Sequence, residues 1–317
     1  MNRLGVVGTM VWDKIHRPGS QAAPVEEWGG IAYALAALEA SLPDDWEIVP
    51  LIKVGKDLAG EANAFLNRLT HRSAADRFVE VLDPNNRVTL HYESHERRSE
   101  RLSGGVPPWT WEELGPMVRD LDALYVNFIS GYEMELDTAK FLRHGFQGPI
   151  YADLHSLFLG VAADGLRIPQ PISHAGQWME CFDVAQINEH ELAFLGPAPM
   201  EVAARAMAAG VRLLVVTLGA EGSVYFTTPP LDLFAPRTQR AAAGPIQTAR
   251  VPVERSWEDG DPTGCGDVFG GTLVAHLLQG VRLETAMAKA NACARRNLSA
   301  RGATNLHYHL RGGIAPR

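Results

Sequence analysis

Short apolar runs alternate along this chain with longer segments in which apolar residues recur at helical spacing. The runs predict strands, and the helical segments between them predict βα units that stack a mostly parallel sheet between layers of helices. The expected fold class is therefore α/β, with three layers. The expected strands are Leu4 to Thr9, Glu47 to Val54, Ala123 to Phe128, Pro149 to Asp153, Val184 to Asn188, Arg212 to Leu218 and Gly222 to Phe226. The expected helices are Ile31 to Glu39, Leu58 to Leu69, Trp111 to Arg119, Glu135 to His144, Met200 to Ala209, Asp267 to Gln279 and Leu283 to Ser299.

One stretch departs from this alternation. Two strand-like pieces, Arg77 to Leu82 and Arg87 to Glu93, are separated only by the turn-forming residues Asp83-Pro84-Asn85-Asn86. This pattern predicts a β-hairpin. Because a hairpin does not continue a βα series, we expect it to form a small antiparallel layer outside the main sheet, in the position of a lid.

Composition narrows the class of protein. The 317 residues are 46% hydrophobic and carry a net charge of -8, which is ordinary for a globular chain and argues against a protein that neutralises nucleic-acid phosphates. The three cysteines are scattered and form no CxxC pair, as expected in a reducing compartment. No stretch has the pattern of a signal peptide or a membrane span. We therefore expect a cytoplasmic protein without membrane or nucleic-acid partners.

The strongest chemical signal is the loop Asp261-Pro262-Thr263-Gly264-Cys265-Gly266-Asp267, which leads into a predicted helix. Glycines at 264 and 266 allow a tight turn that exposes successive N–H groups at the helix N-terminus, where anionic oxygens bind. Such donors stabilise the charge that develops in phosphoryl transfer, and a carboxylate at Asp267 is placed to take a proton from an attacking hydroxyl. The alternative is that Asp267 only caps the helix.

This loop resembles the C-terminal signature of the ribokinase-like, or PfkB, family of carbohydrate and nucleoside kinases, approximately Asp-Thr-x-Gly-Ala-Gly-Asp. The chain departs from the signature at Pro262-Thr263 and at Cys265, where Ala is typical. The resemblance implies that Asp267 is the catalytic base and that Gly264, Cys265 and Gly266 form the anion hole. It also implies that Asp261 and Thr263 lie near a site for a monovalent cation such as K⁺.

Further segments resemble the family in the expected order, so that the resemblance covers nearly the whole chain. They are Gly8 to Asp13, Trp28-Gly29-Gly30, Val54 to Gly60, Asn188-Glu189-His190-Glu191, Thr217-Leu218-Gly219 and Gly222. The resemblance implies that Asp13, Gly29 and Gly30 bind the substrate, that Asn188, Thr217, Gly219, Gly222, Gly264 and Gly266 bind ATP, and that Glu191 holds Mg²⁺ through water. Taken singly, each has an ordinary structural explanation, such as a first-turn acid for Glu191; their joint order does not.

The substrate side departs from the family pattern. Four positions after the Gly-Gly turn the family often has a sugar-binding Asn, and this chain has Ala34. With Tyr33, Ile31 and Trp12 nearby, the site could be more apolar and suit a nucleoside or a hydrophobic sugar derivative. Tyr33 and Asn127 are further candidates for substrate binding, and so is His155, which follows a predicted strand end; structural roles for Asn127 and His155 are equally compatible with their positions.

The sequence thus predicts one ribokinase-like domain over residues 1–317, with a lid from about 11–28 and 76–105. The expected activity is ATP- and Mg²⁺-dependent transfer of phosphate to a hydroxyl, primary in the simplest case, of a sugar or sugar-like molecule. A nucleoside kinase and a sensor that binds without catalysis are the alternatives. A dinucleotide-dependent oxidoreductase is disfavoured, since no Gly-x-Gly-x-x-Gly follows the first strand. Whether two lids pair to form a homodimer is left open.

Overall fold

The computed structural model describes all residues except 17–22, 75–77, 93–97, 236–243, 254–259 and 314–317. Its strands are β1 Asn2–His16, β2 Val25–Gly30, β3 Trp46–Gly55, β4 Val79–Val81, β5 Arg87–Tyr92, β6 Arg98–Ser103, β7 Ala123–Asn127, β8 Ile150–Asp153, β9 Leu159–Val161, β10 Arg167–Pro169, β11 Val184–Asn188, β12 Leu213–Thr217, β13 Ser223–Thr227 and β14 Gln247–Val251. Its α-helices are α1 Ile31–Ser41, α2 Ala59–Leu66, α3 Trp111–Met117, α4 Leu136–Gly145, α5 Ala175–Met179, α6 Glu189–Leu195, α7 Pro199–Ala209, α8 Cys265–Leu278, α9 Leu283–Asn297 and α10 Leu306–Leu310. Short 3₁₀ turns are η1 Lys56–Leu58, η2 His155–Phe158 and η3 Gly219–Glu221.

The central sheet has the strand order β14-β13-β12-β11-β8-β7-β1-β3-β4. The strands from β4 to β12 are parallel to one another, and β13 and β14 complete one edge in antiparallel fashion. Strands such as β7 and β8 are buried at every residue, which explains why they appear in the sequence as continuous apolar runs rather than as alternating patterns. The predicted mostly parallel α/β sheet is confirmed.

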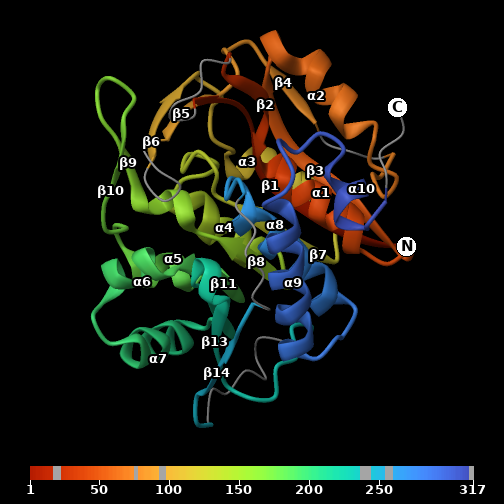
Figure 1. Cartoon of the computed structure of the whole chain (residues 1–317). Helices are drawn as coiled ribbons and strands as arrows, with labels where there is room; N and C mark the ends of the chain where they lie inside the picture. Colours follow the sequence, from red (N-terminus) through yellow and green to blue (C-terminus); the bar gives the residue numbers. More distant parts are fainter. Residues whose placement is uncertain (17–22, 75–77, 93–97, 236–243, 254–259, 314–317) are drawn as a thin grey trace.

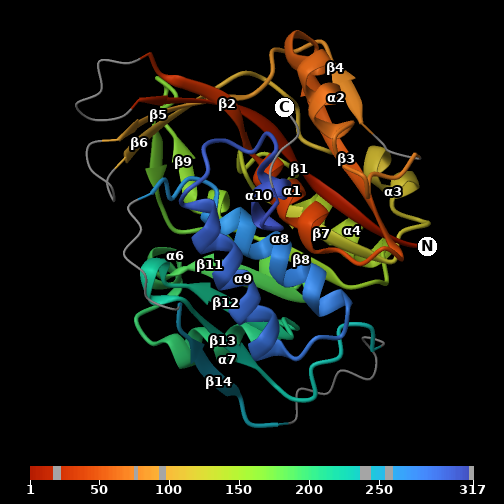
Figure 2. The ribbon, with the colours of Figure 1, turned by 45° about the vertical axis from the view of Figure 1, so that its right-hand side comes forward.

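Helices cover both faces of this sheet (Figures 1 and 2). On one face α1 packs against α8 and α10, and α8 packs against α9. The other face carries α3, α4, α5, α6 and α7, which contact one another in sequence order or nearly so. Each face has its own buried hydrophobic cluster. The α1–α8 contact is close, because Gly271 leaves its space to the backbone of Ala34, and a Cβ there would lie 2.7 Å from the Ala34 carbonyl oxygen.

Strand β1 belongs to two sheets. Its first half pairs with β3 and β7 in the centre, and residues 12–16 pair with β5 in parallel while β2 returns along the opposite edge. Strand β6 pairs with β5 to complete the second, smaller sheet, which stands away from the helical layers at the upper left of Figure 2. The small β layer expected from the sequence is therefore present, formed by the second half of β1 with β2, β5 and β6, and its action as a lid stays a prediction.

The hairpin expected between residues 77–82 and 87–93 is wrong. Strand β4 joins the central sheet beside β3, whereas β5 pairs with β1 and β6. The intervening turn is occupied by Asn85, which is fully buried and accepts from Gly55 N at 3.0 Å while donating to Met10 O at 3.0 Å. The turn residues therefore carry the chain from one sheet to the other instead of reversing it.

Among the described residues, every helix is too short or too polar to cross a membrane.

Candidate active site

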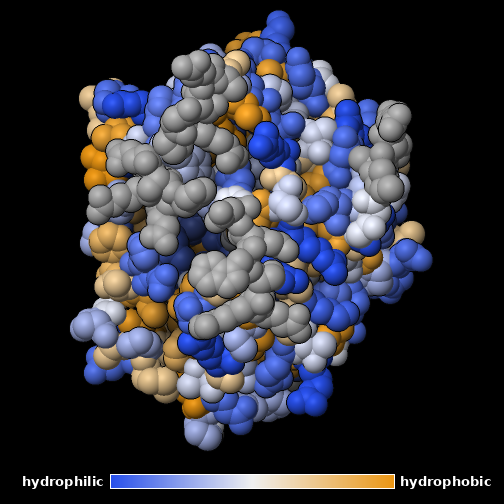
Figure 3. Space-filling view, in the orientation of Figure 1, coloured by the Kyte–Doolittle hydropathy of each residue, from blue (hydrophilic) through white to orange (hydrophobic). Residues whose placement is uncertain are grey.

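The parallel strands bring the predicted site residues to one edge of the sheet. Asn127 ends β7, Asp153 ends β8, Asn188 ends β11 and Thr217 ends β12, so all of them lie at the carboxyl ends of parallel strands. The chain first extends the sheet from β1 toward β3 and later toward β7. Ligands of open α/β sheets bind at such a change of direction. Figure 3 shows a hollow near the middle of this face with mostly hydrophilic visible walls.

Helix α8 begins at this edge with the loop that the sequence singles out. Gly264 is its N-cap and has a φ of 75°, in the left-handed region that favours glycine. A Cβ at Gly264 would lie 2.3 Å from the Tyr33 ring, so both the backbone and the available space require glycine here. The helix starts at Cys265, two residues earlier than expected, and Asp267 therefore lies within its first turn. The Cys265 thiol donates to Ala294 O at 3.3 Å, and its backbone N–H donates to Pro262 O at 3.1 Å, which closes the turn before the helix.

Asp267 is held from the neighbouring strand. Asn127, fully buried at the end of β7, donates from Nδ2 to Asp267 Oδ1 at 2.7 Å. The same amide lies 3.3 Å from the hydroxyl oxygen of Tyr125. Its own Oδ1 is buried and lacks a hydrogen-bond partner in the part of the chain that the structure describes. Asn127, predicted to bind substrate, thus contacts the predicted base directly.

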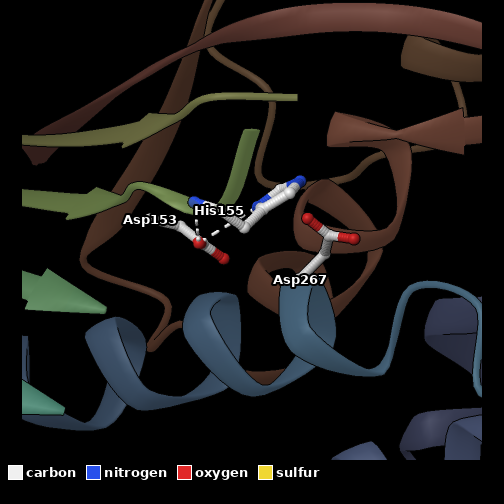
Figure 4. Close-up of side chains that lie close together, drawn as sticks. All are labelled: Asp153, His155 and Asp267. Carbon is white, nitrogen blue, oxygen red and sulfur yellow. Dashed lines mark hydrogen bonds and ion pairs between the residues drawn. The ribbon is translucent and has the colours of Figure 1, made fainter. Parts of the chain in front are cut away.

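A second group of polar side chains connects the sheet to the same loop (Figure 4). Gln186, in the middle of β11, donates from Nε2 to Asp153 Oδ2 at 2.8 Å and to Gly266 O at 3.0 Å. Asp153 Oδ1 lies 3.1 Å from His155 Nδ1 and also accepts from His155 N at 3.2 Å. One ligand-type atom from each of Asp153, His155 and Asp267 lies within 4.8 Å of the other two. The loop, the end of β8 and the middle of β11 therefore form one connected polar cluster.

The charges of this cluster are coupled. Burial lowers the pKa of His155, but the carboxylates of Asp153, Asp267 and Glu191 outweigh burial and raise that pKa to about 10. Burial raises the pKa of Glu191 to about 7, against the opposing effects of His155 and of the hydrogen bonds from Asn188. His155 is therefore an imidazolium at neutral pH, with its side chain 32% exposed.

On the acceptor side, Asp13 and the Gly29-Gly30 turn are packed together. Asp13 is 6% exposed, and a Cβ at Gly29 would lie 1.8 Å from its Oδ2. Gly30 has a φ of 56° and precedes α1. Tyr33 is 2% exposed, and its pKa is raised well above the usual value by burial and then by the charges of Asp13, Asp261 and Asp267. The Tyr33 ring thus lies between the predicted substrate carboxylate and the predicted base.

The other residues of the expected apolar pocket are packed in the interior. Ile31 and Ala34 are fully buried, and Ile31 fills the space beside Gly8. Trp12 is partly exposed and packs edge-on against Trp28, with ring centroids 5.0 Å apart. Of these residues, Trp12 presents the most surface to a ligand.

The predicted nucleotide-side residues lie further along the same edge. Asn188 caps α6, and its Oδ1 accepts from Glu191 N at 2.9 Å, while Glu191 Oε2 accepts from Asn188 N at 2.7 Å. This reciprocal capping box is the structural explanation that the sequence left open for the pair. Gly219 and Gly222 form the turn between β12 and β13, where Gly222 has a φ of 94°. Thr217 and this turn lie two strands away from β8.

The predicted monovalent-cation residues organise the loop and meet the lid. Asp261 Oδ1 accepts from Thr263 N at 3.1 Å and from Thr263 Oγ1 at 2.7 Å. The Thr263 hydroxyl also lies 2.6 Å from the hydroxyl of Tyr92, at the end of β5. The lid sheet thus contacts the loop that begins α8.

Sequence reasoning did not find Asp153 or Gln186. Asp153 ended a predicted strand, as Asn127 and Asn188 did, and that position was its only signal. Gln186 is a polar residue inside an otherwise apolar buried strand, and such a residue needs hydrogen-bond partners. Tyr125 and Tyr151 complete the layer beneath, where Tyr151 donates to Gln186 Oε1 at 2.6 Å.

Comparison with known proteins agrees with the predicted fold and family resemblance. Residues 166–308 match the model of the pfkB family carbohydrate kinases. Ribokinase from Thermotoga maritima is 18% identical, with a TM-score of 0.70 over 98% of this chain and 99% of that one. A putative ribokinase II from E. coli in complex with ATP and Mg²⁺ is 16% identical, with a TM-score of 0.69 over 96% and 95%.

A third solved structure uses another phosphate donor. It is a pyrophosphate-dependent kinase of the ribokinase family, complexed with a pyrophosphate analog and myo-inositol. It is 15% identical, with a TM-score of 0.71 over 96% of this chain and 98% of that one. No curated protein matches the sequence. At these identities the solved structures establish the ribokinase-like fold, and the family match confirms the predicted resemblance and the class of phosphotransferase that it implies.

Proposed function

We propose that this chain, whose residues 166–308 belong to the pfkB family of carbohydrate kinases, transfers the γ-phosphate of ATP to a hydroxyl of a sugar or sugar-like polyol, with Asp267 as the base. The observation that carries the proposal is the position of the Asp267 carboxylate. It lies in the first turn of α8, beside the backbone of the Gly264 loop, and Asn127 donates to it from 2.7 Å away. Base and anion hole are therefore within one turn of each other.

In this mechanism the acceptor hydroxyl lies beside Asp267, which takes its proton as the oxygen attacks phosphorus. The bond between the γ-phosphorus and the bridging oxygen breaks, and ADP leaves. The backbone N–H groups of Gly264 and Gly266 face the charge that develops on the transferred group, and that of Cys265 joins them when it exchanges its 3.1 Å bond to Pro262 O for the phosphate oxygen. Closure of the lid over the site excludes water, which otherwise competes as an acceptor.

ATP and Mg²⁺ are the proposed donor and metal, as in the complex of the E. coli relative. Glu191 suits an indirect role toward Mg²⁺, because its two carboxylate oxygens already accept from Asn188 within the protein and a bridging water leaves those bonds intact. Bound Mg²⁺ would neutralise charge on the donor phosphates. Thr217, Gly219 and Gly222 line the proposed nucleotide side, and Asp261 and Thr263 remain the proposed residues near K⁺.

The acceptor side favours a sugar or polyol over a nucleoside because its apolar residues are buried. Asp13 lies beside Gly29 with 6% of its surface exposed and is the proposed acceptor of hydrogen bonds from substrate hydroxyls. Ile31 and Tyr33 are too buried to offer a broad apolar platform for a base. Asp13, Gly29, Gly30, Tyr33 and Asn127 are the proposed residues around the acceptor.

The test is ADP release from MgATP against a panel of pentoses, hexoses, inositols, sugar phosphates and nucleosides, with and without K⁺. Turnover with a sugar or polyol supports the proposal and names the acceptor, whereas turnover with nucleosides alone replaces it by a nucleoside kinase. Inorganic pyrophosphate as the donor is run in parallel. Calorimetric binding of a sugar without turnover on either donor would instead identify a sensor.

Two further predictions from the sequence belong to the proposal. A cytoplasmic location follows from the cysteine usage, and a homodimer through the lid is tested by light scattering of the purified chain before and after the acceptor is added.

A further inference from the structure

His155 occupies a place that the mechanism above does not use. It opens η2 directly after β8, and its Nδ1 faces Asp153 at 3.1 Å. Among the residues that the structure describes, the second ring nitrogen, Nε2, has no hydrogen-bond partner, so it is the one available to a ligand. Figure 4 shows the ring extending from Asp153 toward the carboxylate of Asp267, and the side chain is 32% exposed. A histidine ring that is fixed through Nδ1 can donate a hydrogen bond from Nε2 to a ligand.

The order of strands places His155 between the two substrates. Strand β8 lies between β7, which carries Asn127 on the acceptor side, and β11, which carries Asn188 on the nucleotide side. Helix α8 crosses above β7 and β8, so that Asp267 lies within the same small cluster as His155. In an in-line transfer the phosphoryl group passes between the phosphate donor and the acceptor. His155, at the end of β8 between the two proposed sides, lies on that path.

The groups around His155 keep it charged. Asp153 on its own strand end, Asp267 on α8 and Glu191 on α6 all favour the protonated ring and raise the pKa of His155 to about 10 despite its burial. The ring is therefore a cation at physiological pH and donates a hydrogen bond from each nitrogen. A protonated imidazole is also a poor metal ligand, since the metal would have to displace the proton.

We propose that His155 binds the phosphoryl group in transfer, donating a charge-assisted hydrogen bond from Nε2 to one of its non-bridging oxygens. This inference rests on the proposed kinase function. The acceptor proton goes to Asp267, the bond to the ADP oxygen breaks, and His155 keeps its own proton throughout. Its contribution is to offset negative charge that is largest in the transition state. Asp153 acts as a positioning residue that fixes the ring.

The first test needs no acceptor. In protein labelled with ¹⁵N at histidine, the His155 signals are assigned by their loss in His155→Gln, and we expect them to show an imidazolium at pH 7. Addition of Mg²⁺ and inorganic pyrophosphate should shift the Nε2 signal of the wild type. Pyrophosphate should bind His155→Gln at least tenfold more weakly than it binds the wild type. His144→Gln, on the exposed end of α4, is the matched control and should bind pyrophosphate like the wild type. A neutral ring at pH 7, or unchanged affinity in His155→Gln, overturns the inference.

The second test uses the acceptor found in the panel. His155→Gln should lower kcat by about 10²–10³-fold, as does removal of one oxyanion donor, while the KM for the acceptor changes less than about threefold. Asp153→Asn should keep His155 as a hydrogen-bond donor but lower the pKa of its ring, so that the loss of kcat at alkaline pH moves to lower pH. In His155→Gln this alkaline loss should vanish. Equal effects on kcat and KM, or an alkaline limb that both variants retain, would show a structural role instead.

The two tests separate the failures. If the wild type transfers phosphate but His155→Gln does so equally well, the kinase assignment stands and the role of His155 is rejected. If no acceptor is phosphorylated while the pyrophosphate-dependent shift of His155 is observed, the phosphate site stands and the catalytic proposal is rejected.

Discussion

Two carboxylate–histidine pairs in the described part of the chain have nearly the same geometry but different surroundings. Glu39 Oε2 lies 3.2 Å from His71 Nδ1 between α1 and the segment before β4, and Asp153 Oδ1 lies 3.1 Å from His155 Nδ1 at the sheet edge. Both carboxylates are almost inaccessible, with side chains 0% and 3% exposed. The pairs differ in the number of hydrogen bonds that each carboxylate accepts and in the exposure of each imidazole ring.

The Glu39 pair is closed. Its carboxylate accepts from Thr70 Oγ1 at 2.5 Å and from His71 N at 2.9 Å, and Arg311 from the C-terminal segment lies 3.1 Å away. Burial alone raises the pKa of Glu39, but the hydrogen bonds from His71 and Thr70 outweigh burial and hold it at about 2. This cluster joins three distant parts of the chain and has its charge fully compensated within the protein, so its role is stability.

The Asp153 pair is open on one side. Asp153 accepts from Gln186 and His155, and the His155 ring extends from Asp153 toward the Asp267 carboxylate (Figure 4). The charges of Asp153, Asp267 and Glu191 all act on this partly exposed ring. The comparison teaches that a carboxylate–histidine contact does not by itself indicate a binding site. A site is indicated where a charged ring stays partly exposed and can still bind a ligand.

The largest effect is expected for Asp267→Asn, which disables the open cluster without changing its shape. Asparagine keeps an oxygen for Asn127 Nδ2 but cannot take the proton of the acceptor, and loss of a general base costs about 10²–10⁴-fold in rate. The measurement is kcat for the acceptor found in the panel. Asp137→Asn, on the exposed surface of α4, is the control. Undiminished kcat in Asp267→Asn would remove the residue from the mechanism.

Glu39→Gln should show the reverse pattern, a loss of stability by about 3 kcal/mol with unchanged kinetics, because it leaves Arg311 without its buried counter-charge and weakens the hydrogen bonds from Thr70 and His71. The depressed pKa fixes the sign of the pH dependence: the contribution of Glu39 is fully present above its unfolded value near 4.5 and is lost as pH falls toward about 2. Urea unfolding at several pH values should therefore show the gap between variant and wild type narrow with acid. If the difference in unfolding free energy did not change with pH, the loss of stability would come from packing and not from the charge of Glu39.

Gly29→Ala tests the acceptor edge of the open cluster. The added Cβ would lie 1.8 Å from Asp13 Oδ2, so the carboxylate must move away from its present position. We expect the acceptor KM to rise about 10-fold or more, corresponding to about 1.4 kcal/mol or more, with little change in the KM for ATP. Gly60→Ala is the matched control, since a Cβ at Gly60 meets nothing within 4 Å. Equal acceptor KM values in both variants would place substrate recognition elsewhere.

The sequence predicts those parts of the fold that depend on neighbouring residues better than those that depend on residues remote in the sequence. Buried strands and amphipathic helices follow from local apolar patterns, and the predicted mostly parallel α/β sheet is confirmed. The supposed hairpin failed because the turn residue Asn85 satisfies Gly55 and Met10, which are remote in sequence. No local pattern contains such partners.

The same limit applies to the site. The loop at Gly264 was visible because its glycines and Asp267 are consecutive. Asp153 and Gln186 meet only because β8 and β11 are neighbours in the sheet, so their connection to Gly266 depends on tertiary pairing. Strand ends marked the positions, but only the register of the strands shows which of those residues share a carboxylate.

The smallest effect is expected for Tyr92→Phe, which leaves both carboxylate–histidine pairs intact and alters only the cover of the open one. The variant loses the 2.6 Å contact between the lid and Thr263, a hydrogen bond worth about 1 kcal/mol. If that bond helps hold the lid over the loop, the KM values for donor and acceptor should rise together by about fivefold, with kcat changed less. Tyr225→Phe removes a comparable bond to Glu284 far from the site and should lower stability by a similar amount with no kinetic effect. Matching kinetics in the two tyrosine variants would mean that the lid contact contributes stability alone, and that access to the open cluster is controlled by other parts of the lid.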